Sequence, residues 1–195
     1  MFGRRPVAVP GAEHCVRGLF LAVLGGLLVG CVAAPEGVVP VQNFEADRYL
    51  GRWYEIARLD HSFERGLNNV TANYSLREDG AIRVRNRGFN VEDGEWEDAE
   101  GVARFVGSER VGHLKVSFFG PFYGAYVVFE LEREQYSYAF VSGPSRGNLW
   151  FLSREPVVSD ALKAQFVQAA RARGFPVEEL IWVDQSGAPA VENSG

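Results

Sequence analysis

Few side chains in this sequence have the types and spacing that a catalytic centre needs. The two thiols, Cys15 and Cys31, both lie near the N-terminus, so no disulfide can cross-link the rest of the chain. Beyond that segment the histidines are His61 and His113, and the sequence has no Gly-x-Ser-x-Gly motif, no histidines at metal-ligand spacing and no glycine-rich phosphate loop. Glu55 is the one candidate for acid–base chemistry, and a lone carboxylate is more commonly a hydrogen-bonded structural acid. We therefore expect no catalytic residue, no metal site and no cofactor.

Cys31 has the setting for a different chemistry, covalent lipid attachment. Three arginines precede an apolar run over residues 19–29, which suits an export signal and is shorter than the roughly 20 residues of a spanning helix. The run is followed by L-V-G-C, ending at Cys31, which resembles the lipobox of bacterial lipoproteins. This resemblance implies that residues 1–30 are a lipoprotein signal peptide and that Cys31 carries palmitate-like acyl chains that hold the protein to a membrane. The alternative is an ordinary signal peptide with an incidental cysteine.

Charge and the residue after the cysteine indicate where the protein acts. The formal net charge is −5 and the basic residues are scattered, so we expect no nucleic-acid partner. Val32, rather than an aspartate, follows Cys31, and this resembles lipoproteins of the outer membrane in bacteria with two membranes. The sequence therefore predicts a lipid-anchored protein of the outer membrane.

The elements that position these residues are mainly strands. Aromatic residues make up 13% of the 195 residues and there are 22 glycines, which favours many strands joined by tight turns. Asp79-Gly80 and Asp93-Gly94 are hairpin signals between alternating runs. The predicted strands are residues 53–59, 70–76, 82–86, 102–106, 114–119, 126–131, 138–142 and 149–153. Eight antiparallel strands can close a barrel just wide enough for one small ligand.

One helix and one short strand follow the barrel. Ser159 is a good N-cap, Leu162, Phe166 and Ala170 repeat at four-residue spacing, and Gly174 ends the helix. A single apolar stripe predicts that this helix packs on the outside of the barrel. We expect a final strand at 180–183, a lipidated N-terminus and tether at 31–43, and a flexible tail at 186–195.

Two motifs give this pattern a family resemblance. Residues 51–54 read G-R-W-Y, which resembles the G-x-W-Y signature on the first strand of the lipocalin family, and a short helical turn is expected just before it. Residues 149–154 read L-W-F-L-S-R and resemble the last lipocalin signature. The resemblance implies that Gly51, Trp53 and Arg154 are structural signature residues and that the guanidinium lies across the indole at the closed end of the barrel.

The resemblance extends over nearly the whole mature chain and places the lipocalin domain at 44–185. Residues 54–61, 63–66 and 115–124 resemble the bacterial outer-membrane branch, which is also similar to plant lipocalins and apolipoprotein D. One departure concerns the middle signature, usually Thr-Asp-Tyr. Here it reads Gln135-Tyr136-Ser137-Tyr138, so that corner lacks its usual acid.

Strand alternation predicts which side chains face the interior. Arg83 and Arg85 must point to water, so Val84 and Asn86 point inward, and Leu76 is expected inward on the preceding strand. For the sixth strand we favour Tyr126 and Val128 inward over the opposite set of Val127, Phe129 and Leu131. The predicted ligand pocket comprises Tyr74, Val84, Asn86, Phe105, Val116, Phe118, Tyr126, Val128, Trp150 and Leu152.

This predicted interior is apolar, aromatic and narrow, which suits one acyl chain. We therefore expect storage or transport of fatty acids or lysophospholipids in the cell envelope, with the membrane as partner through the lipid anchor. The alternatives are a haem or retinoid-like pigment as ligand, hydrolysis or isomerisation of a lipid at Glu55 or Tyr126, and a barrel filled by its own side chains. The resemblance also allows a homodimer.

Overall fold

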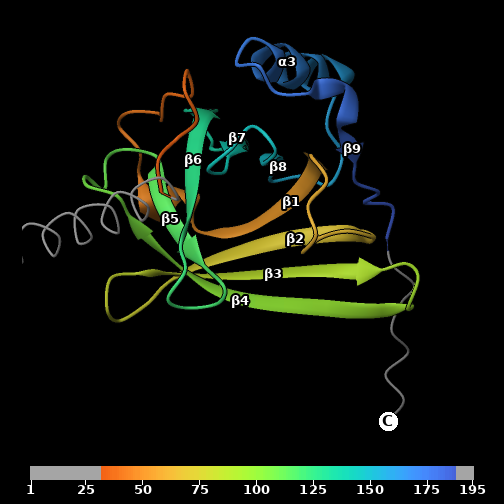
Figure 1. Cartoon of the computed structure of the whole chain (residues 1–195), viewed down its shortest axis with the longest axis horizontal. Coiled ribbons are helices and arrows are strands. Elements are labelled where there is room, and N and C mark those ends of the chain that lie inside the picture. The colour runs from red at the N-terminus through yellow and green to blue at the C-terminus, as the bar shows by residue number, and fades with distance from the viewer. Residues whose placement is uncertain (1–31, 188–195) are drawn as a thin grey trace, which may run out of the picture. The chain divides into compact units, whose positions relative to one another are not determined.

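The structure, a computed structural model, describes residues 32–187 (Figure 1). The acylation site predicted at Cys31, the signal segment and residues 188–195 of the predicted tail lie outside this range. Among the helices within the range, none is both long and apolar enough to cross a membrane.

Eight antiparallel strands form the barrel, each paired with the next in sequence, and the first strand pairs with both the second and the eighth. The predicted all-β, up-and-down barrel is confirmed. The strands are β1 (Gly51–Arg58), β2 (Leu67–Leu76), β3 (Ile82–Asn90), β4 (Glu95–Phe105), β5 (His113–Ser117), β6 (Gly124–Leu131), β7 (Tyr138–Ser142) and β8 (Leu149–Ser153).

The alternation that predicted the inward faces is visible on β3. Ile82 and Val84 are buried, whereas Arg83 and Arg85 are exposed and pair across to β4 with Glu100 and Asp98. The prediction is wrong for Leu76, which is 61% exposed. Leu76 is the last residue of β2, where the strand turns into the hairpin, so no neighbouring layer covers it.

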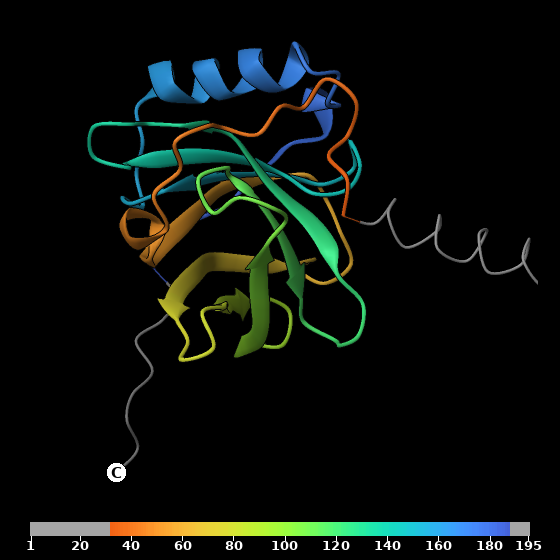
Figure 2. The same cartoon turned by 90° about the vertical axis from the view of Figure 1, so that its left-hand side faces the viewer.

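A second apolar layer lies outside the barrel, beneath the helix α3 (Asp160–Arg171) (Figure 2). Phe166 and Ala170 are fully buried against outward-facing residues of the sheet. The Ser159 hydroxyl accepts a hydrogen bond from the Leu162 amide at 3.2 Å, which caps the helix as predicted. A short 3₁₀ helix, η1 (Val177–Glu179), leads into β9 (Ile181–Trp182), which pairs with the last residues of β1.

The segment before the barrel differs from the expected free tether. Residues 32–43 lie along the outside of the barrel, where Val38 is buried and the Val41 amide donates to the Val128 carbonyl at 2.9 Å. His113 Nε2 lies 2.8 Å from the Val32 carbonyl oxygen. Apolar side chains and backbone hydrogen bonds therefore fix a segment whose composition alone suggested a linker.

The closed end of the barrel is built around the predicted pair of signature residues. The Arg154 guanidinium lies 3.8 Å from the centroid of the buried Trp53 ring, which confirms their stacking. Arg154 also donates to the carbonyls of Arg52, Arg48 and Leu50 at 2.7, 2.8 and 3.0 Å. Arg48 lies in the short helix α2 (Ala46–Tyr49), and Leu50 and Arg52 follow it. One side chain thus joins the end of β8 to the start of β1. Gly51 has φ +92°, a conformation that favours glycine at this turn.

The corner that lacks the usual acid obtains one from three residues earlier. The Glu132 carboxylate accepts hydrogen bonds from the amides of Glu134 and Gln135 at 2.6 and 2.9 Å and from the Ser137 hydroxyl at 3.0 Å. These hydrogen bonds lower the pKa of Glu132 to about 2. The Glu132 carboxylate is thus the acceptor for backbone and side-chain donors at this corner.

Candidate functional site

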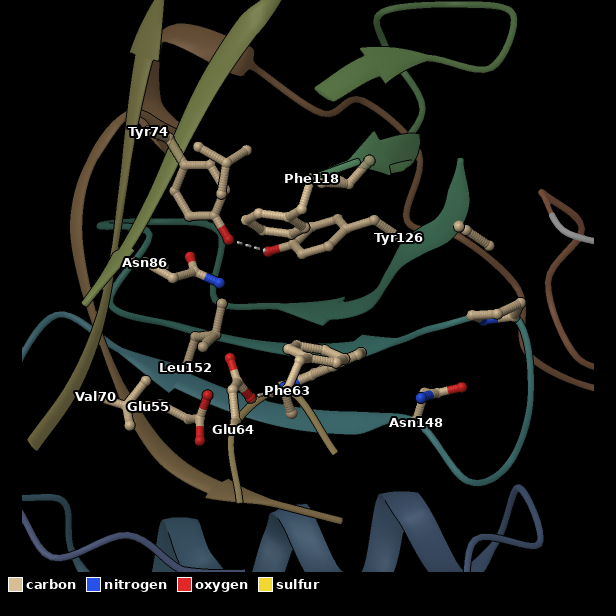
Figure 3. Close-up of a pocket in the computed structure, with 17 residues that line it drawn as sticks. Glu55, Phe63, Glu64, Val70, Tyr74, Asn86, Phe118, Tyr126, Asn148 and Leu152 are labelled. Atoms are coloured by element: carbon tan, nitrogen blue, oxygen red, sulfur yellow. Dashed lines mark hydrogen bonds between the residues drawn. The ribbon is translucent and has the colours of Figure 1, made fainter. Parts of the chain in front are cut away.

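The barrel encloses an apolar cavity of about 300 Å³ (Figure 3). Strands supply most of its wall, and the β1–β2, β5–β6 and β7–β8 loops supply the rest. Its 17 lining residues are Glu55, Phe63, Glu64, Val70, Ala72, Tyr74, Val84, Asn86, Val116, Phe118, Gly124, Ala125, Tyr126, Pro144, Asn148, Trp150 and Leu152. The interior is therefore not filled by its own side chains.

Eight of the ten predicted pocket residues line this cavity. The two that do not are Phe105 and Val128, which belong to the inner apolar cluster. The Phe105 ring packs edge-on against Phe44, with centroids 6.1 Å apart. Phe44 precedes the barrel and occupies the closed end, so these side chains contact protein there. Tyr126 and Val128 both face the interior, as alternation predicted. Alternation carries no information, however, about how deep in the barrel a residue lies.

Three tyrosines form a hydrogen-bonded chain on one side of the cavity. The Tyr126 hydroxyl lies 2.8 Å from that of Tyr74 and 2.7 Å from that of Tyr49. Burial raises the pKa of all three phenols, so they stay protonated at neutral pH. Three hydroxyl protons share two contacts, which leaves one O–H free to donate elsewhere.

Two buried carboxyl groups, Glu55 and Glu64, line the opposite side of the cavity (Figure 3). Arg58 lies behind them and donates to Glu55 Oε1 at 2.7 Å and to the carbonyls of Glu64 and Leu67 at 2.7 and 3.0 Å. The Trp150 indole donates to Glu64 Oε2 at 3.1 Å. Both terminal nitrogens of the Arg58 guanidinium are thus hydrogen-bonded to protein acceptors.

Burial sets the protonation of this group of side chains. It raises the pKa of Glu55, and the nearby Glu64 carboxylate adds to the effect, while the pKa of Glu64 is itself raised by burial. Burial, with a smaller contribution from Arg58, lowers the pKa of His61 to about 4. The His61 ring stacks on Phe63 at 4.2 Å and is neutral near pH 7, so its 3.3 Å approach to Glu64 is not an ion pair. The carboxyl pair holds a proton to higher pH than free glutamates would.

Alternation did not predict four of the five lining residues that come from loops: Phe63, Glu64, Pro144 and Asn148. The fifth, Phe118, directly follows β5 and was predicted as part of that strand. Loops have no periodicity from which an inward direction follows. For Phe63 and Glu64 the one available signal was the resemblance of residues 63–66 to the outer-membrane branch. Glu55, considered as a catalytic acid, is instead paired with Arg58. Among residues 32–187, no three His, Cys, Asp or Glu side chains come together as metal ligands.

Comparison with known proteins places this geometry among described families. The Lipocalin-like domain model matches residues 44–185. The chain is 57% identical over 170 residues to the outer membrane lipoprotein Blc of Vibrio cholerae, an alignment that covers 87% of this chain and 99% of that protein. It is 53% identical over 164 residues to the protein of the same name from Escherichia coli K12, covering 83% and 92%. Among solved structures, insecticyanin from the tobacco hornworm matches with a TM-score of 0.61 and 21% identity, covering 78% of this chain and 86% of that one.

Proposed function

Because this chain belongs to the lipocalin family, we propose that it binds the acyl chain of a fatty acid or a lysophospholipid inside its barrel and stores or transports that lipid in the cell envelope. Lipocalins are binding proteins, and no relative reported above is named as an enzyme. The relatives with more than half of their residues identical are named outer membrane lipoproteins, so the protein is lipid-anchored at the outer membrane.

The cavity is the observation that carries this proposal. Its wall between the tyrosines and the carboxyl pair is largely apolar, with Val84, Val116, Phe118 and Leu152 in contact with the empty space. Asn86 is a polar side chain in this part of the wall (Figure 3). Each buried methylene contributes about 0.8 kcal/mol, so about ten methylenes contribute about 8 kcal/mol against the cost of immobilising the chain. A single acyl chain of ordinary length is therefore a sufficient ligand.

The charges along the wall support entry of the chain with its tail first. None of the 17 lining residues is a lysine, arginine or histidine, and Arg58 is already bound to Glu55 and two carbonyls. A carboxylate or phosphate carried deep into the cavity would thus lose water without gaining a cation. The anionic group of the lipid remains at the mouth, where water solvates it.

The anchor belongs to the same proposal. Cys31 is the acylated residue, and the next residue, Val32, is held against the barrel by His113. The cavity is thereby kept close to the membrane whose lipids it takes up. We also propose that two such barrels form a homodimer. Experiment must decide this and must identify the acyl chain.

Native mass spectrometry of the purified protein, with and without added fatty acids and lysophospholipids, tests this function. We expect one lipid mass per barrel, replaced by an added lysophospholipid. Absence of bound lipid both before and after addition would refute the proposal. A visible absorbance band of the same sample would instead favour a haem or retinoid-like pigment. The native mass spectrum also reports whether the protein is a dimer.

A further inference from the structure

Three phenylalanines at the mouth of the barrel expose most of their side chains to solvent. Phe119 is 80% exposed, Phe122 77% and Phe63 55%. Single exposed apolar residues are ordinary on protein surfaces. These three, however, line one second cavity of about 380 Å³, so they form a single patch, which we call the aromatic rim.

The second cavity adjoins the first. Phe63, Glu64, Val70, Asn86 and Phe118 line both of them. It therefore forms an entrance between the β1–β2 loop, which carries Phe63, and the β5–β6 loop, which carries the other two rim residues. A lipid that enters the inner cavity by this route passes the aromatic rim.

The chain leaves the described region close to this entrance. Val32, which directly follows Cys31, is held by the His113 side chain at the first residue of β5, and the Glu36 carbonyl accepts from Arg146 in the β7–β8 loop at 2.7 Å. Phe118 lies five positions after His113 along an extended strand, which at about 3.3 Å per residue is roughly 17 Å. Figure 2 shows the beginning of the described chain and the β5–β6 loop on the same, right-hand side of the barrel. An acyl anchor at Cys31 thus holds the aromatic rim within reach of a bilayer surface.

We propose that the aromatic rim docks on the surface of the lipid bilayer, so that a lipid moves between the membrane and the cavity without crossing water. Phenylalanine side chains bury favourably at the boundary between headgroups and acyl chains. The proposal rests on the proposed function, since it gives the route by which that lipid arrives.

The charges beside the rim indicate the kind of lipid surface. Glu97 and Asp98 line the second cavity, and the adjoining β3–β4 turn carries Glu92 and Asp93. Arg87 is the one basic residue among the side chains that line this cavity. An excess of acidic groups is repelled by anionic lipids, so we infer docking on a zwitterionic surface.

A single thiol on the rim tests this docking. In the acylated mature protein Cys31 is blocked, so Phe122→Cys introduces one thiol for an environment-sensitive fluorophore. Val157→Cys is the matched control, because Val157 is also 80% exposed but lies between β8 and α3, away from the rim. The unsubstituted protein must take up no label.

In phosphatidylcholine vesicles we expect the Phe122 label to shift to the blue and to be quenched by nitroxide-labelled lipid at least threefold more than the Val157 label. Partial replacement by phosphatidylglycerol should reduce that quenching. Equal quenching at the two positions would overturn the proposal, as would a blue shift without lipid quenching, which indicates that a second copy covers the rim. A protein that does not stay on vesicles would overturn it too.

A second variant separates this proposal from the proposed function. Phe119→Asp with Phe122→Asp should slow the uptake of lysophospholipid from vesicles at least tenfold and leave the affinity for dispersed monomeric lysophospholipid within twofold. Equal uptake rates in both proteins would overturn docking while lipid binding stands. If the unsubstituted protein does not bind monomeric lysophospholipid, the proposed function is refuted instead.

Discussion

A tryptophan at position 84 should shorten the cavity and leave the barrel folded. Val84 lies on β3 opposite Tyr74 and lines the cavity beside the tyrosine chain, so a larger side chain there has empty space to occupy. If the indole displaces about four methylenes of the ligand, at about 0.8 kcal/mol each, binding weakens by about 3 kcal/mol, or roughly 200-fold. The crowding itself should cost about 1–3 kcal/mol of stability, which a barrel of this size tolerates.

Calorimetric titration with lysophospholipids of increasing acyl length, below their micelle concentrations, measures this effect. In the unsubstituted protein each added methylene should strengthen binding about fourfold until the chain reaches the tyrosines, beyond which affinity levels off. Val84→Trp should reach that plateau about four carbons earlier. Arg85→Trp is the matched control, because Arg85 lies on the same strand and faces water.

If the plateau and the affinities of Val84→Trp match those of the unsubstituted protein, the acyl chain lies elsewhere and the predicted position beside Val84 is wrong. An equal shift in Arg85→Trp would assign the effect to the strand rather than to the cavity.

Four further predictions concern the closed end, the cavity wall and the anchor. Arg154→Met removes hydrogen bonds to four carbonyls and the contact with the signature indole, so urea denaturation should show a loss of about 3 kcal/mol and thermal unfolding a fall of about 10 °C. Arg104→Met, which breaks an exposed ion pair, should cost below about 1 kcal/mol, and equal losses in the two variants would contradict the role of the closed end. The pKa of His61 is lowered to about 4 in the folded state, whereas its value in the unfolded chain is about 6.5. Between these two pH values the unfolded chain binds the extra proton, so stability falls as pH falls. His61→Phe should therefore lose less stability than the unsubstituted protein between about pH 7 and about pH 4.5, and identical pH profiles would show that His61 does not titrate this way. The pKa of Glu55 is raised by burial, so the folded state holds a proton that the unfolded chain releases above about pH 4.5, and stability falls as pH rises. The stability of Glu55→Gln, measured relative to that of the unsubstituted protein, should therefore be higher at about pH 8 than at about pH 5. The reverse order in urea titrations would count against the buried proton. Cys31→Ser should abolish incorporation of radiolabelled palmitate and release the protein from the outer-membrane fraction, and continued labelling would place the acyl group on another residue.

The strands and the helix could be predicted because burial leaves a period in the sequence. Outward arginines on β3 fixed the inward phase of Val84 and Asn86, and Ser159 with its four-residue apolar spacing fixed the helix. The pairing of Trp53 with Arg154 followed from the family resemblance rather than from any local pattern, because their contact joins residues about a hundred positions apart.

Depth and loop contacts could not be predicted in the same way. Phe105 faces inward as expected but meets Phe44, which precedes the barrel and closes that end. Glu64 reaches the cavity from a loop, where only tertiary packing sets the direction of a side chain. The composition of residues 32–43 suggested a tether, yet Val38 finds an apolar site on the outside of the barrel. Contacts between distant segments decide each of these cases.

The central claim is that one acyl chain lies inside the barrel, against Trp150. The most direct measurement is quenching of tryptophan fluorescence in delipidated protein by a lysophospholipid whose acyl chain carries bromine near its middle. The account predicts quenching that saturates at one lipid per chain and is largely lost in Trp150→Phe. Quenching that rises without saturation, or that is equally strong in Trp150→Phe, would contradict it.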